Sequence, residues 1–340
     1  FGTQVVATKG RVTYKLKKMR KKATRCAFDD KQTLVKNNEY IGEVFFNTET
    51  DKFEWKYAPK GEDEYTILVV KNIFPIIDKS IEEVNSKNLV IIESREHLTR
   101  FHLLSHNSIR ACLIAYQTLM KQYYDEYICF ILYKNQGKSA QSSMEHIHSQ
   151  LVCLDQIPNR IINNAYEIFK KDDCGLCNRY HELMTTDDQY ILREYKYFIE
   201  YCPKYMYPYT IRILAKRHIP SLLVLTEEEI SELAKIIKIS TNRVIGNFGD
   251  LDYNILYHQA PKIFMNRWHL FIEIIPRGLN EPAGFEMLTG IRVTENPERA
   301  AEQLKMIKTR CVMCGEYYHG ELGLCPYCGY LKLTLIEEDF

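Results

Sequence analysis

The sequence of 340 residues predicts an α+β protein made of two copies of one unit, followed by a small C-terminal zinc ribbon. Strand-like and helix-like segments follow the same order in both halves, and each half ends in a histidine-bearing strand, which indicates an internal duplication. Two C-x-x-C pairs near the C-terminus predict the ribbon. We expect an N-terminal arm at 1–25, a first half at 26–170, a second half at 171–308 and the ribbon at 309–340.

The elements of the first half follow from alternation and helical spacing. Apolar and polar residues alternate on both sides of a turn-like NTETD segment, which predicts a hairpin, and short runs of β-branched residues predict further strands. Apolar residues at helical spacing, with Asn107 or Ser108 as the cap, predict one long helix. The strands are expected at 40–48, 52–57, 65–70, 89–93, 127–133 and 150–154, and the helix at 105–124.

The second half repeats this order of elements. The sequence T-E-E-E opens a strongly amphipathic segment and predicts a capped helix, the counterpart of the long helix in the first half. The strands are expected at 190–202, 210–215, 253–258 and 269–276, and the helices at 226–247 and 297–310.

Composition excludes several classes of protein. With 45 Lys+Arg against 44 Asp+Glu, the net charge of +1 gives no overall field to attract nucleic acid or an anionic membrane. No apolar run approaches the roughly 20 residues that a membrane span needs, and the first residues lack the basic-then-apolar order of a signal peptide. We expect a soluble, cytoplasmic protein with a sizeable core and without membrane or nucleic-acid partners.

The most informative segment is HIHSQ at 146–150. On a strand, alternate residues face the same side, so His146, His148 and Gln150 are expected to project into one site. Two imidazoles and an amide make a poor hydrophobic surface, which argues against a role in the core. Imidazole can act as a metal ligand, a general base or a covalent nucleophile. The small, polar loop just upstream is suited to presenting N–H groups and hydroxyls to phosphate.

Five segments in order carry a resemblance to a known family. They are VKNIFP at 70–75, IIESREH at 91–97, N-x-G-(x5)-S-x-x-H-x-H-x-Q at 135–150, YNILYHQAP at 253–261, and IIPR at 274–277 with AGFE at 283–286. On these motifs, residues 26–308 resemble the galactose-1-phosphate uridylyltransferase and ADP-glucose phosphorylase branch of the histidine triad superfamily. The resemblance implies two histidine-triad-like units, each an antiparallel sheet with helices. It does not cover the ribbon.

The resemblance also implies an activity. His148 would attack the α-phosphorus of a nucleotide sugar or similar nucleoside diphosphate compound, forming a covalent nucleotidyl-histidine, and a phosphate acceptor would then take the nucleotide. His146 and Gln150 would assist at the same site. The resemblance assigns phosphate or nucleotide contacts to Asn72, Asn135, Gly137, Ser143 and Gln150, and contacts with the sugar phosphate to Phe285 and Glu286. It also implies a homodimer.

Two alternative functions stay open. In a phosphorylase or hydrolase, inorganic phosphate or water would resolve the His148 adduct. In a nucleotide-binding regulatory protein, the zinc ribbon would dock a partner, although an intact H-x-H-x-Q motif is not needed for binding alone. Arg292 and Gln141 depart from the residues that galactose-pathway enzymes carry, and they favour another sugar phosphate, inorganic phosphate or another nucleotide.

Up to three zinc sites are expected. Two C-x-x-C pairs at short separation, the second followed by Gly, are typical of a closed structural site; they supply Cys311, Cys314, Cys325 and Cys328. In the first half, the resemblance implies a site at Cys26, Asp29, His97 and His146, with Asp29 in place of the family's second cysteine; loss of this metal is the alternative. In the second half, it implies a site at Cys174, Cys177, His218 and His269, with His181 and His258 as alternatives.

Overall fold

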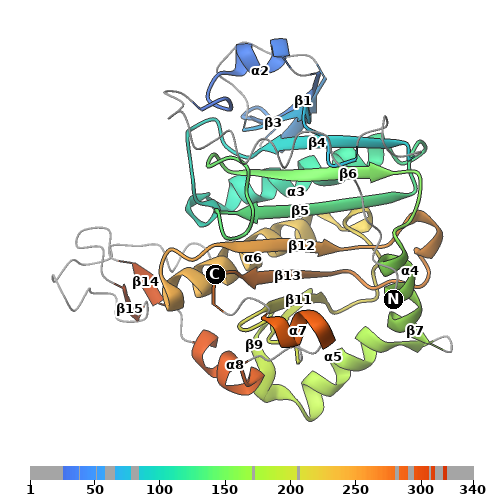
Figure 1. Ribbon diagram of the computed structural model, residues 1–340, viewed down its shortest axis with the longest axis vertical. Coiled ribbons are helices and arrows are strands. Elements are labelled where there is room, and N and C mark those ends of the chain that lie inside the picture. The colour runs from blue at the N-terminus through green and yellow to red at the C-terminus, as the bar shows by residue number, and fades with distance from the viewer. Residues whose placement is uncertain are drawn as a thin grey trace.

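The centre of the molecule is one antiparallel sheet of 11 strands, in the order β2-β1-β3-β4-β6-β5-β12-β13-β11-β10-β9 (Figure 1). The computed structural model describes residues 26–37, 39–50, 52–57, 66–77, 84–170, 173–204, 207–279, 283–289, 295–305, 308–310 and 317–319. The predicted N-terminal arm and the four cysteines of the predicted ribbon lie outside these ranges. Within them, no helix combines the length and apolar character that crossing a membrane requires.

The first half contributes six strands and a long helix, as the sequence predicts. Ser105, rather than Asn107 or Ser108, caps the long helix, because its side chain accepts a hydrogen bond from Ser108 N. A short helix before the first strand was not predicted. The elements are α2 Lys31–Asn37, β1 Tyr40–Asn47, β2 Lys52–Lys56, β3 Ile67–Lys71, β4 Ser86–Ile92, η1 Phe101–Leu103, α3 His106–Gln122, β5 Cys129–Gln136 and β6 His148–Leu154.

The second half keeps the predicted order, with three differences. The strand expected at 190–202 is a hairpin of two strands, because the chain turns between Tyr195 and Phe198. The last helix ends at Lys305, and the sequence did not predict the three short α-helices at Asn159–Ile168, Gly175–Thr185 and Gly284–Thr289 or four strands of two or three residues each. The last two elements before the expected boundary at residue 170 are α4 Asn159–Ile168 and β7 Phe169–Lys170. The elements after it are β8 Asp173–Cys174, α5 Gly175–Thr185, η2 Asp188–Tyr190, β9 Ile191–Glu194, β10 Phe198–Tyr201, β11 Ile211–Ala215, η3 Leu222–Val224, α6 Glu227–Phe248, β12 Tyr253–His258, η4 Lys262–Phe264, β13 Phe271–Pro276, α7 Gly284–Thr289 and α8 Pro297–Lys305. Two short strands, β14 Lys308–Arg310 and β15 Tyr317–His319, follow at the expected start of the ribbon.

Strand pairing confirms the duplicated architecture. β5 of the first half pairs with β12 of the second half at the centre of the sheet, and outward from this pair the order β6-β4-β3 on one side corresponds to β13-β11-β10 on the other. The registers correspond as well: Gln150 pairs with Tyr133 and Val90, and Glu273 pairs with Leu256 and Arg212. Position by position, therefore, Gln150 corresponds to Glu273 and His148 to Phe271.

The two long helices cover one face of the sheet. α3 and α6 pack against each other there, and buried residues of both halves form one hydrophobic cluster beneath them (Figure 1). A capping box at Thr226 and Glu229 starts α6, as its T-E-E-E sequence predicts. Along β6, Leu151 and Cys153 belong to the cluster under the helices. Because strand side chains alternate between faces, His148 and Gln150 lie on the opposite face.

Candidate active site and metal-ligand clusters

His148 and Gln150 share the face of β6 that the long helices leave uncovered, as the motif predicts. Both side chains are buried to more than nine-tenths. β6 begins only at His148, so His146 precedes the strand instead of sharing its face. His146 is fully buried and its ring lies between Asp29 and the carbonyl of Ser94. The two histidines of the motif therefore lie in different places: His148 on the uncovered face of β6, and His146 before the strand, beside Asp29.

The surroundings of His148 hold its imidazole neutral and oriented. Burial lowers the pKa of His148 to about 4, although a hydrogen bond to a backbone carbonyl opposes this effect. Its Nδ1 lies 2.9 Å from the carbonyl oxygen of His146, so Nδ1–H donates there. The lone pair is then on Nε2. A neutral imidazole with one nitrogen tied to the backbone is the form that can act as a nucleophile.

Gln150 and the loop after β5 offer groups that can donate to phosphate. The Tyr133 hydroxyl donates to Gln150 Oε1 at 2.9 Å, which leaves the amide nitrogen of Gln150 to donate to a ligand. Asn135 lies near the end of β5 on the same face as Tyr133, and Gly137 and Ser143 lie in the loop that leads from β5 to His148. Asn135 thus shares the face of His148 and Gln150, and the loop that carries Gly137 and Ser143 connects β5 to the start of β6.

The second half holds this loop in place. The backbone N–H of Ser139 donates to Asp252 Oδ2 at 2.6 Å, and Asn254 donates to Asn135 Oδ1 at 2.8 Å and to the Ala140 carbonyl at 3.2 Å. Gly137 has a φ of 83°, and a Cβ there would come within 1.7 Å of Asp252 Oδ1. Sequence reasoning missed Asp252 and Asn254, because nothing in a linear pattern shows which strand crosses a loop of the other half.

Asn72 lies farther along the sheet. It directly follows β3, which is separated from β6 by β4. Its Oδ1 accepts a hydrogen bond from Phe74 N at 2.9 Å and forms a tight turn. His148 is in the row of Ile92 and Leu68, so Asn72 is four residues along β3 from that row, about 13 Å at the usual rise of a strand. A ligand that contacts both residues must extend across β4.

Phe285 and Glu286 do not join this site within one chain. Helix α7 is drawn near β11, in the second half of the sheet, whereas β6 lies in the first half (Figure 1). The Glu286 carboxylate accepts a hydrogen bond from the N–H of Ala283 at the start of its own helix. Phe285, Met287 and Leu288 of this helix are more than half exposed.

Two groups of side chains have the composition of metal sites. In each group, one ligand atom from every residue lies within 4.8 Å of the others. We name them the first ligand cluster and the second ligand cluster. The first consists of Cys26, Asp29, His97 and His146, and the second of Cys174, Cys177, His218 and His269. These are the two sets of four that the sequence predicts. The cysteines of the predicted ribbon lie outside the described residues.

In the first ligand cluster, Asp29 bridges the two histidines. Its Oδ1 lies 2.8 Å from His97 Nδ1 and 3.0 Å from His146 Nδ1. Burial would raise the pKa of Asp29, but hydrogen bonds from both rings outweigh it and lower that pKa. His146 Nε2 donates to the Ser94 carbonyl at 2.9 Å, so a metal would bind at Nδ1, where it would replace the proton that is donated to Asp29. A thiol, a carboxylate and two imidazoles suit tetrahedral zinc.

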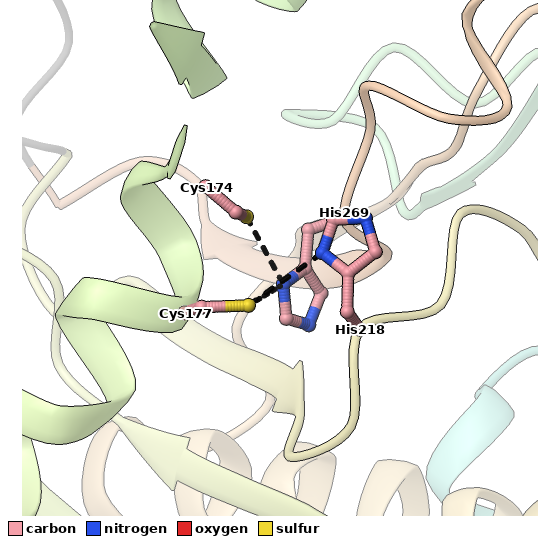
Figure 2. A group of neighbouring side chains, drawn as sticks. All are labelled: Cys174, Cys177, His218 and His269. Carbon is pink, nitrogen blue, oxygen red and sulfur yellow. Dashed lines mark hydrogen bonds between the residues drawn. The ribbon is translucent and has the colours of Figure 1, made fainter. Parts of the chain in front are cut away.

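The second ligand cluster is sulfur-rich. Cys174 and Cys177 lie at the start of α5, and both sulfurs are 3.5 Å from Nδ1 of His269; Cys177 is equally close to His218 (Figure 2). His269 Nε2 donates to the Ala215 carbonyl at 2.8 Å. Burial and the neighbouring thiol raise the pKa of Cys177 to about 12, so a cation is needed to stabilise thiolates here. This donor set fits a closed Cys₂His₂ zinc site.

The alternatives for the second cluster are not supported. His258 Nε2 lies 2.9 Å from Glu273 Oε2, and its ring stacks on Phe271. His181 lies on the exposed side of α5. Neither belongs to the second ligand cluster.

The fold is that of the uridylyltransferases. A solved structure of a uridylyltransferase superposes on 77% of this chain and 97% of its own, with a TM-score of 0.63 and 22% identity. The crystal structure of an ADP-glucose phosphorylase from Arabidopsis thaliana with bound ADP-glucose superposes on 86% of this chain and 94% of its own, with a TM-score of 0.67 and 22% identity.

Sequence comparison leads to the same proteins. The chain is 24% identical to ADP-glucose phosphorylase of Arabidopsis thaliana over 276 residues, 74% of this chain and 77% of the relative. It is 25% identical to a galactose-1-phosphate uridylyltransferase of Thermotoga maritima over 224 residues, 58% of this chain and 68% of the relative. No protein-family model matches the chain. The resemblance stated from the motifs is confirmed: homologues of this chain are ADP-glucose phosphorylase and galactose-1-phosphate uridylyltransferases.

Proposed function

We propose that this protein is a nucleotidyltransferase that moves a nucleoside monophosphate from a nucleotide sugar to a phosphate acceptor through a covalent adduct on His148. The observation that carries the proposal is the neutral, buried His148, with Nδ1–H bonded to a backbone carbonyl beside a phosphate-binding loop. The enzymes to which the chain is homologous, a phosphorylase and uridylyltransferases, support the reaction class.

The first step forms the adduct. The lone pair of His148 Nε2 attacks the α-phosphorus, and the bond from that phosphorus to the bridging oxygen breaks. The sugar 1-phosphate leaves with the bonding electrons, and Nδ1 keeps its proton. The imidazolium of the adduct stays hydrogen-bonded to the His146 carbonyl. Gln150 and the N–H groups of the loop donate to the phosphate oxygens, where charge must be stabilised.

The second step returns the enzyme to its starting state. An oxygen of the acceptor phosphate attacks the α-phosphorus, and Nε2 leaves with the electron pair of the nitrogen–phosphorus bond. Burial supports this exchange because it disfavours the protonated imidazole that could not attack again. Asn72, at the far side of β4, is in a position to contact the nucleoside part of the same ligand.

We also propose zinc at both ligand clusters and at the predicted ribbon. The second ligand cluster would hold zinc at Cys174, Cys177, His218 and His269, and the first at Cys26, Asp29, His97 and His146. Zinc in these closed donor sets would supply structural cross-links. His146 precedes His148 by two residues, so the first ligand cluster also anchors the start of β6.

Adduct trapping tests the main proposal. Protein is mixed with a nucleotide sugar that carries the label on the α-phosphate, and is then denatured in alkali, where phosphohistidine survives. We expect labelled protein from the wild type and unlabelled protein from His148→Ala. His102→Ala, a histidine outside the site, serves as the control. Full turnover by His148→Ala contradicts the mechanism.

A phosphorylase is the second candidate, and the similarity to ADP-glucose phosphorylase over 74% of the chain favours it. The two candidates differ only in the acceptor. Isolated adduct is offered inorganic phosphate, a hexose 1-phosphate or water, and the released nucleotide is identified. A nucleoside diphosphate indicates a phosphorylase, a nucleotide sugar indicates a transferase, and a nucleoside monophosphate indicates a hydrolase.

We further propose a homodimer in which Glu286 of one chain serves the His148 of the other. The separation of α7 from β6 and the exposed apolar side chains of α7 support it. Inactive His148→Ala and Glu286→Ala proteins are mixed under conditions that exchange subunits. Shared sites restore up to about a quarter of wild-type turnover in the random mixture. Sites formed within one chain restore none.

A further inference from the structure

We propose that Glu93 and Lys134, a buried ion pair behind β6, position His148 for its attack. The inference rests on the proposed function. Both residues act as positioning residues, because they lie on the face of the sheet that α3 covers, away from the face that carries His148. They contact the backbone of His148 and the side chain of Ser149, and they do not touch the imidazole of His148.

The pair is the centre of a small buried network. Lys134 Nζ donates to Glu93 Oε2, and the Ser149 hydroxyl donates to Glu93 Oε1. Tyr116 of α3 completes it, with its hydroxyl 2.7 Å from Glu93 Oε1 and 2.8 Å from Ser149 Oγ. All four side chains are at most 1% exposed. Every charged atom in the network therefore has a partner inside the protein.

Two members of the network hold the residues of the nucleophile segment. Lys134 Nζ also donates to the backbone carbonyl of His148, at 3.1 Å. Glu93 holds the side chain of Ser149, the next residue. The peptide that joins His148 to Ser149 is thus fixed from the covered face, while the His146 carbonyl fixes the imidazole from the other. A shift in this peptide would turn Nε2 away from the phosphorus, and rates depend steeply on such alignment.

An ion pair is an unusual choice for this place if it serves folding alone. Moving two charges out of water costs more than burying apolar side chains of similar volume, so apolar replacements often stabilise a protein. The neighbours are apolar: Lys134 lies 4.6 Å above the Phe101 ring, and Leu132 and Leu151 belong to the same buried cluster. Positioning of the adjacent nucleophile would explain why the ion pair is kept at this place.

The second half provides an internal control for this argument. Lys134 pairs with Ser149, and the corresponding pair is Tyr257 with Ile272. Glu93 N donates to the Ile147 carbonyl just before β6, and Ala215 N makes the corresponding bond to Leu270 just before β13. The half with Phe271 in place of His148 thus has Ala, Tyr and Ile where the first half has the network. At these positions the second half folds without an ion pair. Its own buried pair, Glu200 with Arg243, lies on β10 and α6, away from the strand that carries Phe271.

The test distinguishes an effect on the orientation of His148, which changes the rate of adduct formation, from an effect on nucleotide-sugar binding. In the double variant Glu93→Gln/Lys134→Met, both charges are removed and the side-chain volumes are kept. We expect an unchanged or raised thermal midpoint, a dissociation constant for the nucleotide sugar within threefold of wild type, and adduct formation at least tenfold slower in rapid-quench experiments. Ser149→Ala and Tyr116→Phe, which disturb the fold less, should each slow adduct formation at least threefold. Ile272→Val, at the position equivalent to Ser149, should leave it unchanged.

The outcomes distinguish this inference from the proposed function. If the double variant, Ser149→Ala and Tyr116→Phe all form the adduct at the wild-type rate, the network has no positioning role. If the double variant does not fold, Ser149→Ala and Tyr116→Phe decide the question alone. If His148→Ala still forms the adduct, the proposed function itself fails, whatever the network does.

Discussion

The two halves of the molecule share strand order and register but differ at the position that matters for chemistry. The first half has His148 where the second has Phe271, and Gln150 where the second has Glu273. Around Phe271 the face is occupied: the His258 ring stacks on it, and the Arg212 guanidinium lies 4.6 Å from its ring centre. A duplicated fold can therefore keep one reactive centre and use the other copy for a different purpose.

That purpose is visible at the junction of the halves. Asp252 and Asn254 of the second half hold the loop that precedes His148, and Arg100 of the first half donates to Asp252 at 2.9 Å and to Asp250 at 2.7 Å. Both halves keep a ligand cluster, at His146 and at His269, just before the corresponding strand. The second half thus retains the scaffold and a candidate set of metal ligands, and it has Phe271 in place of His148.

The largest effect is expected from exchanging the two residues that distinguish the halves. In His148→Phe/Phe271→His, the imidazole moves to a half that lacks the loop and the buried network, so turnover should fall at least about a thousandfold. Steady-state assays measure the loss. Phe271→Leu, a conservative core change, is the control and should retain turnover within about twofold. Labelled adduct on residue 271 of the exchanged protein would contradict the assignment of roles.

The sequence predicted the sheet and the long helices, because these leave local marks. Alternation and helical spacing appear within 20 residues. The two ligand clusters were implied by the family resemblance, and the C-x-x-C pair at Cys174 and Cys177 is a local mark of the second. The hydrogen bond from Ser139 N–H to Asp252 could not be predicted from a local sequence pattern, because only the pairing of β5 with β12 brings the two residues together. Lys134 was equally hidden. In YICFILYKNQ it resembles a lysine at the exposed end of a strand, and only the packing of α3 shows that it is buried.

Loss of a metal ligand should destabilise the protein more at the second ligand cluster than at the first. The second has two thiols and three of its four residues at least partly buried, whereas the first has a carboxylate in place of one thiol. A site with zinc at 100 times its dissociation constant contributes about 2.7 kcal/mol to stability. Cys177→Ser should therefore lower the free energy of unfolding by about 3 kcal/mol, and Asp29→Asn by less. Denaturant titration and zinc analysis of each variant measure this. Equal losses of unfolding free energy in both variants would show that the first ligand cluster binds zinc as strongly as the second.

Glu273, the counterpart of Gln150, should make the second half sensitive to acid. Burial would raise its pKa, but the Arg212 guanidinium and His258 lower it to about 2. A carboxyl whose pKa is lowered by folding stabilises the protein above its unfolded pKa of about 4.5, and that contribution is lost as the pH falls toward 2. It amounts to about 3 kcal/mol at neutral pH.

Glu273→Gln gives the second half the residue type of the first and tests this linkage. The variant should be less stable than the wild type at pH 7 by that amount, and the difference should shrink steadily between pH 4.5 and pH 2. Urea unfolding at several pH values measures it. A difference that stays constant with pH would mean that Glu273 titrates normally in the folded protein.

The smallest effect on stability is expected from substituting two glycines, one in each half. Both have positive φ, 83° at Gly137 and 73° at Gly249, but a Cβ would collide with Asp252 only at Gly137 and meets no atom within 4 Å at Gly249. Gly249→Ala should cost about 1 kcal/mol of stability for the backbone strain alone. Gly137→Ala should cost about 2 kcal/mol, because Asp252 must also move. That movement breaks the hydrogen bond from Ser139 N–H to Asp252, so only Gly137→Ala should slow adduct formation. Equal rates of adduct formation in both variants would show that the position of this loop does not affect catalysis.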